Sequence, residues 1–441
     1  MSEKIMSLED VAMNGYHKLL TVRAVGGWFV DGYILSIIGV VLIYFTQDLH
    51  LNNFWQGMIA AAAIIGICIG GIIGGLLTDR YGRKIMFLIA PLLFTIFSAL
   101  QFFAESGEWL FLCRLLIGIG VGIEYTVGSA LLTEFLPKKS RGPCISALVT
   151  MWFVGAVCAY IMGNVILATV EYEGWRWVLA SSAVLSGLLL LLRLGTQESP
   201  RWLMSKQRHQ EANLVIQQVY GKTFSTENLG YTPVLRKINL KALILDGYLL
   251  RILFVSIFWA CCVTPIFAVY SFAPKVLGAL NFQGESSIYS SILITLLFTL
   301  GCVIGTLVIN KMGRRKMLLH SFLWSLLALL GLGYFADASA FIVLFFFGAY
   351  AIFIGGAQIL TIVYPNEIFP TEVRAVAVGL CTSISKVGVV LGTWLVPIAV
   401  DSIGITNTMY VAALINCIGL MVTYWFAVET SHLKLEDASK I

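Results

Sequence analysis

The stretch AVGGWFVDGYILSIIGVVLIYFT, residues 24–46, is a nearly unbroken apolar run that contains a single carboxylate, Asp31. A helix rises about 1.5 Å per residue, so a run of this length crosses a hydrocarbon core of about 30 Å. It therefore predicts a transmembrane helix. With this one, twelve such runs occur along the chain, at residues 24–46, 55–77, 86–103, 109–133, 144–168, 177–194, 250–273, 288–309, 317–335, 340–363, 375–399 and 407–428.

The composition agrees with a chain that lies mostly in lipid. Hydrophobic residues make up 59% of the 441 residues and charged residues only 12%, whereas soluble domains carry about 25% charge. Helices satisfy their own backbone hydrogen bonds in lipid, so the predicted fold class is an all-α membrane protein with twelve transmembrane helices.

The basic residues predict the orientation of these helices. Lys and Arg gather in alternate connections, at residues 80–84, 138–141, 201–241 and 311–316. Since basic residues are enriched in cytoplasmic loops, we expect a multi-pass protein of the cell membrane with both termini in the cytoplasm. The net charge of +5 then reflects topology, and we expect the lipid bilayer, not a nucleic acid, as the partner of this chain.

The chain divides into two similar halves. The polar stretch 195–249 separates a first six-run half, 1–194, from a second, 250–441. GLLTDRYGRK (75–84) is echoed by TLVINKMGRRK (306–316), and EFLPKKSR (134–141) by EIFPTEVR (367–374). Repeated halves are typical of transporters, with the substrate site between the halves and alternating access by rocking.

These motifs carry a family resemblance. Together with RLLIGIGVG (114–122), GWRWVL (174–179), ESPRWL (198–203) and YPNEIFPTEVRA (364–375), they resemble the major facilitator superfamily, and within it the sugar-porter, phosphate:proton and aromatic-acid or metabolite:proton symporter branches. The resemblance implies two pseudo-symmetric six-helix halves, and we expect a monomer.

The resemblance also implies a cytoplasmic gate built from the charged residues of the motifs. These are Asp79, Arg80, Arg83, Glu134, Arg141, Glu198, Arg201, Arg314, Glu367 and Arg374. Pairs of Arg and carboxylate side chains have the geometric specificity that a latch between the halves needs. The alternative is that these charges are solvated and only set the topology. Asn310 stands where the first half has Asp79, which predicts a weaker latch in the second half.

Few charged residues lie well inside the runs, and each is costly there. They are Asp31, Arg114, Glu124 and Lys386, whereas Arg193 and Arg251 lie near run ends. We expect the last two to extend to the membrane interface. Counted at 1.5 Å per residue, Asp31 and Glu124 lie about 10 and 13 Å from the cytoplasmic side.

Asp31, Glu124 and Arg114 form a candidate site for proton coupling. Two carboxylates at one depth, with a guanidinium above them, are suited to bind and release a proton. The resemblance implies coupling roles for the Asp of the first run and for the Arg that begins R-x-x-x-G-x-G in the fourth. The alternative is an ion pair that only sets helix packing.

Lys386 and several aromatic residues are candidates for binding substrate. Lys386 lies near the middle of its run, in a half without a carboxylate inside its runs, which favours an anionic substrate. The alternatives are that it extends to the interface or pairs with Asp31 or Glu124. The remaining candidates are Tyr125, Trp152, Trp259, Tyr270, Gln358 and Trp394, although aromatic side chains also face lipid or pack between helices.

The segment WACCVTPIFAVY, residues 259–270, argues against two substrates. It lacks the Gln pair by which hexose porters hold sugar hydroxyls. Val263 also stands where phosphate porters carry an Asp. We therefore expect proton-coupled symport of a small organic metabolite, and specifically an organic anion. The alternatives are a proton-coupled sugar or polyol transporter, and a sensor of the same fold without transport. The sequence contains no nucleotide loop, metal-ligand cluster or nucleophile motif, so we expect neither an enzyme nor a cofactor.

Overall fold

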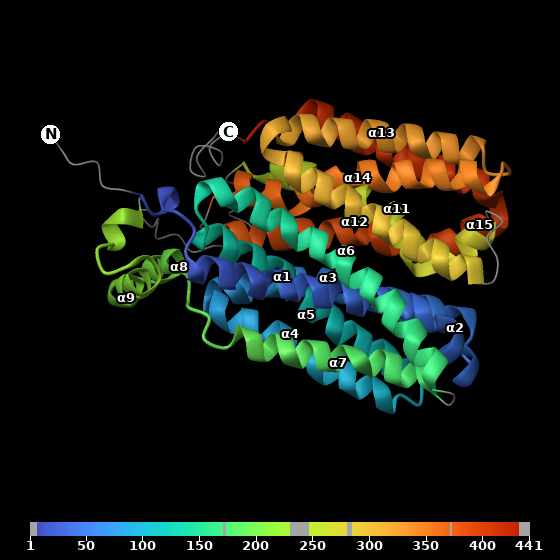
Figure 1. Ribbon diagram of the computed structural model, residues 1–441, viewed down its shortest axis with the longest axis horizontal. Coiled ribbons are helices and arrows are strands. Elements are labelled where there is room, and N and C mark those ends of the chain that lie inside the picture. The colour runs from blue at the N-terminus through green and yellow to red at the C-terminus, as the bar shows by residue number, and fades with distance from the viewer. Residues whose placement is uncertain (1–6, 171–172, 230–246, 280–284, 371–372, 432–441) are drawn as a thin grey trace.

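The computed structural model describes residues 7–170, 173–229, 247–279, 285–370 and 373–431. In these residues the regular structure is helical throughout. Figure 1 shows the helices of the first half, α1 to α7, lying alongside those of the second half, α11 to α15. The fold class predicted from the sequence is therefore confirmed.

The first half contains six spans. Its helices are α1 (Gly15–Ser36), α2 (Ile38–Asp48), α3 (Asn53–Tyr81), α4 (Arg83–Leu100), α5 (Gly107–Phe135), α6 (Lys138–Thr169) and α7 (Gly174–Arg193), with short 3-10 helices η1 (Leu8–Asp10) and η2 (Gln101–Phe103). α1 and α2 form one span, because only Ile37 interrupts them.

The first span begins nine residues earlier than its apolar run predicts. Asn14 caps α1: its side chain accepts from the backbone N–H of His17, and the His17 ring accepts from the backbone N–H of Asn14. This reciprocal cap satisfies two backbone donors and sets the start of the helix within a polar segment. Asp31 consequently lies near the middle of the 34-residue span.

The connection between the halves and the second half complete the bundle. The connection contains α8 (Pro200–Ser205), α9 (His209–Tyr220) and η3 (Thr226–Leu229), and the second half contains α11 (Leu249–Ala279), α12 (Glu285–Met312), α13 (Arg314–Tyr334), α14 (Ala340–Ile368) and α15 (Arg374–Phe426). α15 holds two spans, because the backbone breaks at Gly404, where φ is 80°. Within the described residues, eleven helices are long and apolar enough to cross a membrane. A further apolar helix, Val376–Gly392, is shorter.

Close helix pairs within each half depend on glycine. A methyl group at Gly118 of α5 would overlap the carbonyl of Ala63 in α3, and one at Gly301 of α12 would overlap the carbonyl of Ile352 in α14. Small residues let helices approach closely where lipid provides no hydrophobic drive for association. The two helix pairs occupy equivalent places in the two halves.

The halves meet along two lines. Ser383 of α15 donates a hydrogen bond to the Cys68 carbonyl of α3 at 2.6 Å. The rings of Phe153 in α6 and Phe298 in α12 are stacked, with their centroids 5.6 Å apart. The two halves are thus in direct contact through α3 and α15 and through α6 and α12.

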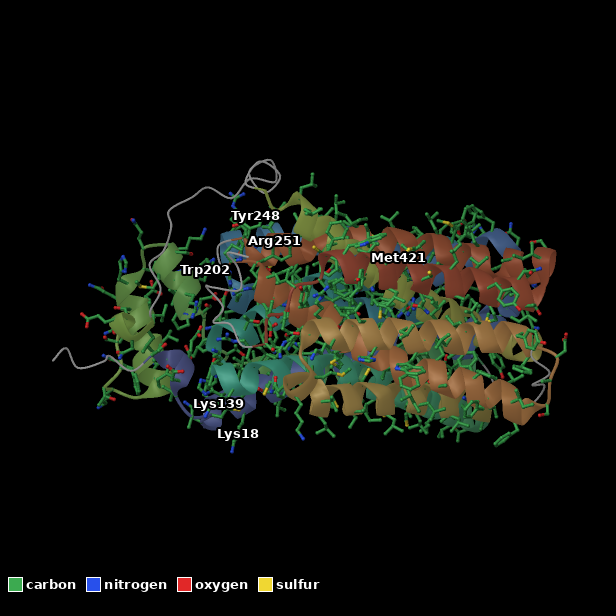
Figure 2. All side chains as sticks on the ribbon, turned by 90° about the horizontal axis from the view of Figure 1, so that it is seen from above. Lys18, Lys139, Trp202, Tyr248, Arg251 and Met421 are labelled. Atoms are coloured by element: carbon green, nitrogen blue, oxygen red, sulfur yellow. The ribbon has the colours of Figure 1, made fainter. Side chains whose placement is uncertain are left out.

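One end of the bundle carries most of the charge. Lys18, Lys139, Trp202 and Arg251 gather there, next to α8 and α9 (Figure 2). We call this the basic end.

Candidate functional site

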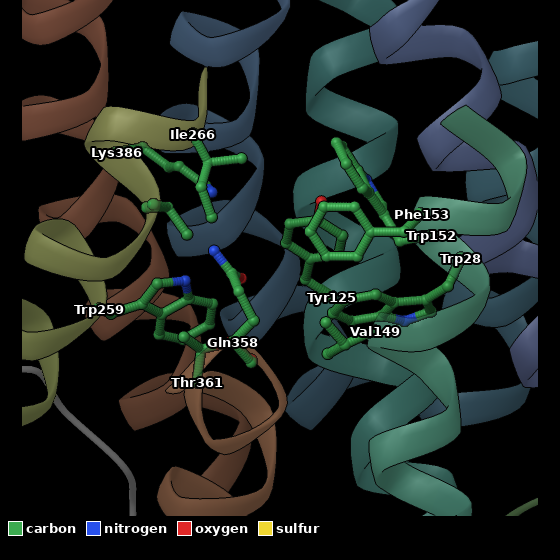
Figure 3. A pocket seen from close by; sticks show the side chains of 11 residues that line it. Trp28, Tyr125, Val149, Trp152, Phe153, Trp259, Ile266, Gln358, Thr361 and Lys386 are labelled. Atoms are coloured by element: carbon green, nitrogen blue, oxygen red, sulfur yellow. The ribbon is translucent and has the colours of Figure 1, made fainter. Parts of the chain in front are cut away.

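A cavity lies between the halves, about half way along the helices (Figure 3). Its lining residues come from α1, α5, α6, α11, α14 and α15. They are Trp28, Tyr125, Val149, Trp152, Phe153, Trp259, Val263, Ile266, Gln358, Thr361 and Lys386. Five of the predicted binding residues are therefore brought together here: Tyr125, Trp152, Trp259, Gln358 and Lys386.

The two walls of the cavity differ in chemistry. The first half provides aromatic rings: Trp28 is stacked on Tyr125 with centroids 4.4 Å apart. The second half provides the ammonium of Lys386 and the amide of Gln358, together with the ring of Trp259 (Figure 3). The Lys386 nitrogen lies 5.8 Å from the centroid of the Tyr125 ring, within the range of a cation–π contact. A small ligand with one apolar and one polar face matches these walls.

The cavity is small in this conformation. Its volume is about 30 Å³, and one water needs about 10–15 Å³. It has room for a few waters, so a metabolite can bind only when the walls move apart.

Two of the predicted binding residues are not among the described residues that line the cavity. Trp394 is 55% exposed on α15, and it lies next to Gly57 of α3. The side chain of Tyr270 lies outside the described residues.

Six of the lining residues were not predicted from the sequence, although helical spacing points to most of them. Val263 and Ile266 follow Trp259 by four and seven positions, and Thr361 follows Gln358 by three. Residues at these spacings share one helix face. Trp28 similarly precedes Asp31 by three positions.

The three predicted proton-coupling residues differ from one another in their contacts. Arg114 is buried and donates to the Ile34 carbonyl at 2.9 Å. Glu124 is bound by Arg193 through two hydrogen bonds, of 2.7 and 2.5 Å. Both carboxylate oxygens of Asp31 are buried, and neither has a hydrogen-bond partner within the described part of the chain. Asp31 lies within electrostatic range of Glu124 and Arg193.

The expectation that Arg193 extends to the interface was wrong. Its side chain is fully buried at the end of α7, between α1, α4 and α5. The guanidinium also donates to the carbonyls of Phe87 and Arg23, and it lies 3.6 Å from the centroid of the Phe87 ring. Carbonyls and one carboxylate thus replace water around this cation.

The predicted gate residues all lie at helix ends near the basic end. In the first half, Arg83 pairs with Asp79 at 3.0 Å and with Glu134 at 3.1 Å. The Glu198 carboxylate accepts from the backbone N–H groups of Arg83 and Lys84, at the start of α4. A carboxylate there is favoured by the helix dipole. Burial nevertheless raises the pKa of Glu198, while these backbone hydrogen bonds oppose the rise.

The second half repeats this arrangement. Arg314 pairs with Glu367 at 2.7 Å, and Glu429 accepts from the backbone N–H groups of Arg314 and Arg315, at the start of α13. Burial acts to raise the pKa of Glu429, but these hydrogen bonds outweigh it and the pKa is lowered. Asn310 accepts from Arg314 at a longer 3.4 Å, so the second half has one charged contact fewer, as its sequence predicts.

Glu9 of η1 lies among the predicted gate residues, although the sequence motifs did not point to it. Its carboxylate accepts from Arg201 at 2.7 Å and from Arg141 at 3.2 Å. Burial alone would raise the pKa of Glu9, but the two guanidinium groups outweigh burial and lower it. No motif marks an acidic residue so near the chain start.

Between the two halves of the chain, the charged residues of the predicted gate interact at longer range. Each of the ion pairs described above lies within the first half and the connection that follows it, or within the second half. Across the halves, the charge of Arg374 acts on Glu9, and the charge of Glu367 acts on Arg141. Arg80 is exposed and lies 5.3 Å from the centroid of the Tyr81 ring.

Comparisons with known proteins agree with this architecture. The family model described as "Sugar (and other) transporter" matches residues 19–441. YaaU of Escherichia coli strain K12, named as a metabolite transport protein, is 36% identical over 99% of this chain and 97% of its own length. The arabinose-proton symporter of Bacillus subtilis strain 168 is 27% identical over 97% of this chain and 95% of its own length.

A solved structure shows the same fold. The proton:xylose symporter XylE, bound to 6-bromo-6-deoxy-D-glucose, aligns with a TM-score of 0.87 at 21% identity, over 96% of this chain and 98% of its own. The chain belongs to the sugar (and other) transporter family, and it has the fold of XylE, which is named as a major facilitator superfamily protein. It is thus a multi-pass membrane transporter, not an enzyme.

Proposed function

We propose that this transporter is a proton-coupled symporter of a small organic anion. The observation that carries the proposal is the ammonium of Lys386 in the wall of the central cavity, opposite the stacked rings of Trp28 and Tyr125. A carboxylate of the substrate would contact the ammonium, and its apolar part would lie on the rings. Trp152, Trp259 and Gln358 would complete the binding site.

The proposal assigns proton coupling to the acidic side chains buried next to this cavity. Asp31 and Glu124 would bind the coupling proton, and Arg114 would brace α1 against α5 through the Ile34 carbonyl. Two relatives in this fold are named as proton symporters, one of arabinose and one of xylose, which supports coupling to protons here.

The proposal also assigns the basic end to the cytoplasm. The charged groups there would form a gate between the halves, which opens and closes when the halves rock. Both termini would then be cytoplasmic, in accordance with the positive-inside rule. YgcS of Escherichia coli strain K12 is 33% identical over the whole of this chain, and it is named as an inner membrane metabolite transport protein. This name supports a cell-membrane location.

A neutral sugar or polyol is the second candidate substrate. It is favoured by the names of relatives, including the arabinose-proton symporter and a glucose transporter of Staphylococcus epidermidis. Gln358 and the indole of Trp259 could hydrogen-bond hydroxyl groups in the same cavity.

Calorimetry on the purified protein tests the choice, with matched probes that differ in charge: benzoate against benzyl alcohol, and gluconate against glucose. We expect a carboxylate to bind more tightly than its neutral partner. Lys386→Gln should weaken that binding by about 10- to 150-fold, since a hydrogen bond to a charged group contributes about 1.5–3 kcal/mol. Lys386→Arg should retain part of it.

Lys316→Gln, at an exposed lysine of the basic end, is the matched control and should leave the affinity unchanged. If the neutral probes bind as tightly as the carboxylates, or if Lys386→Gln has no effect, the organic-anion assignment fails and the sugar or polyol takes its place. A protein that binds a probe but never accumulates it in proteoliposomes would be a sensor.

A further inference from the structure

Asp31, Glu124 and Arg193 form a compact group beneath the cavity. Their side chains are fully buried, in α1, α5 and α7 respectively. Arg193 holds both oxygens of Glu124, while Asp31 lies within electrostatic range of both. The pattern of the family points to Arg114, but that guanidinium donates to a backbone carbonyl.

We propose that Arg193 is the coupling cation of this transporter, and that it passes between Glu124 and Asp31 as the site loses and gains its proton. The proposal rests on the proposed symport and names the residue that performs the coupling. It assigns a function to a side chain at the end of α7, a position outside every motif discussed above.

The charge balance of the group supports one proton per cycle. Two carboxylates and one guanidinium are neutral together when they share one added proton. In the described conformation Glu124 is paired with Arg193, whereas Asp31 is not hydrogen-bonded to any described residue. Burying an ionised carboxylate without such partners is costly, so the neutral acid is the form that fits at Asp31.

Loss of that proton would change the pairing. Asp31 would become a carboxylate, the group would carry one negative charge, and Asp31 would compete with Glu124 for Arg193. Rebinding of a proton at Asp31 would return the guanidinium to Glu124. No other reactant is needed, because only a proton enters and leaves.

A direct route connects this group to the cavity. Gly27 lies so close to the Arg193–Glu124 pair that a methyl group there would overlap both side chains. Gly27 precedes Trp28, and Glu124 precedes Tyr125, and these two rings are stacked in the cavity wall. Movement of the pair would therefore reach the substrate site directly, because the next residues along α1 and α5 are the lining residues Trp28 and Tyr125.

Other charged or titratable groups around the pair have contacts of their own. Arg23 of α1 donates to the carbonyls of Leu192 and Leu194, and Arg114 of α5 donates to that of Ile34. α4 contributes the ring and the carbonyl of Phe87. Tyr125 of α5 is buried within electrostatic range of Asp31 and Glu124, and Lys386 lies beyond it.

Infrared difference spectroscopy tests the proposal without a known substrate, because a protonated carboxyl group has a C=O stretch of its own. In the parent, pH titration of the reconstituted protein should remove one buried carboxyl band. Asp31→Asn should abolish that band, and Glu124→Gln should shift it to lower pH, because the released Arg193 then pairs with Asp31. Arg193→Gln should add a second band, because Glu124 then lacks its counter-cation and takes up a proton.

The double variant Arg193→Gln/Glu124→Gln removes the pair without leaving either charge alone, so it should fold even if Arg193→Gln does not. Compared with Glu124→Gln alone, the double variant should keep the Asp31 band to higher pH by about one unit or more, because the two variants differ only in Arg193 and a neighbouring cation favours an ionised carboxylate. If the Asp31 band titrates at the same pH in both variants, the pair is merely structural and the proposal is overturned.

Arg23→Gln is the matched control. Arg23 is also buried and also anchors the end of α7, but it does so through carbonyl groups. It should lower the melting temperature without moving the carboxyl bands. If the bands respond to Arg193 as expected but a pH gradient drives no accumulation of any probe, the symport assignment fails while the role of Arg193 in proton binding stands.

Discussion

Among single residues, the charged side chains inside the membrane spans are the basis of the proposed function. The sequence identifies Asp31 and Glu124 because an ionisable group inside an apolar run is costly and therefore rarely without a role. It misjudges Arg193, because a residue at the end of a run has two possible surroundings, the interface or a neighbouring helix. Only the packing of α7 against α1, α4 and α5 decides between them.

Asp31→Asn should abolish proton-driven accumulation and leave counterflow exchange intact, because exchange requires rocking but no net proton movement. Uptake and exchange of the best-binding calorimetry probe in proteoliposomes would be compared. Glu124→Gln should give a milder effect, with transport shifted to lower external pH, since the released Arg193 would then pair with Asp31. Accumulation by Asp31→Asn against a gradient would make Asp31 a structural residue.

Gly27→Ala should destabilise the protein by about 1–3 kcal/mol, since it inserts a methyl group into a packed site. The methyl group would overlap the Arg193–Glu124 pair, so accumulation should fall as well. Gly26→Ala is the control, because its methyl group would meet only the flexible end of Leu189, at 3.1 Å. Equal melting temperatures for the two variants would argue against tight packing at Gly27.

At the scale of elements, the short helix η1 joins parts of the gate that the motifs leave separate. Glu9 is the shared acceptor of Arg141, at the start of α6, and of Arg201, in α8. The motifs predict the two arginines but not their common partner. A three-residue helix has no hydropathy period, and its position depends on the helices beneath it.

Glu9→Gln should lower stability by about 1.5–3 kcal/mol at neutral pH, the range of a hydrogen bond to a charged group. The folded-state pKa of Glu9 is below its ordinary value of 4.5. Its ionised form therefore stabilises the fold fully above that value, and the contribution is lost as pH falls through the lower folded pKa. Thermal unfolding from pH 7 down to pH 4 and below should show the parent approaching the variant.

Glu211→Gln provides the control for Glu9, because Glu211 pairs with Arg208 on an exposed surface. Exposed pairs contribute about 0–1 kcal/mol, so little change is expected at any pH. A Glu9 variant that melts like the Glu211 variant would show that η1 does not brace the gate.

At the scale of the whole molecule, the orientation follows from the distribution of basic residues. Cysteines introduced one at a time at Glu105 and Asp337, both exposed and far from the basic end, should react with a membrane-impermeant thiol reagent in intact cells. Cysteines at Lys139 and Lys316, exposed at the basic end, should react only after permeabilisation. Labelling of Lys139→Cys in intact cells would reverse the proposed topology. A background in which the reactive native cysteines are replaced is the control.

The sequence by itself determined the spans, the two halves and most of the binding candidates. Hydropathy is a property of neighbouring residues, and a charged residue inside an apolar run stands out in the sequence whatever its partner is. Tyr125, Trp152, Trp259, Gln358 and Lys386 could therefore be proposed before their meeting in one cavity was known.

Only the tertiary structure decided which charges pair. Arg193 binds Glu124, and Glu9 binds Arg141 and Arg201, across separations of 69, 132 and 192 positions along the chain. The start of α1 at the Asn14 cap and the small volume of the cavity were decided in the same way. Pairing is a competition among all donors and acceptors within reach, and the reach of a side chain is set by helix packing, which no local pattern contains.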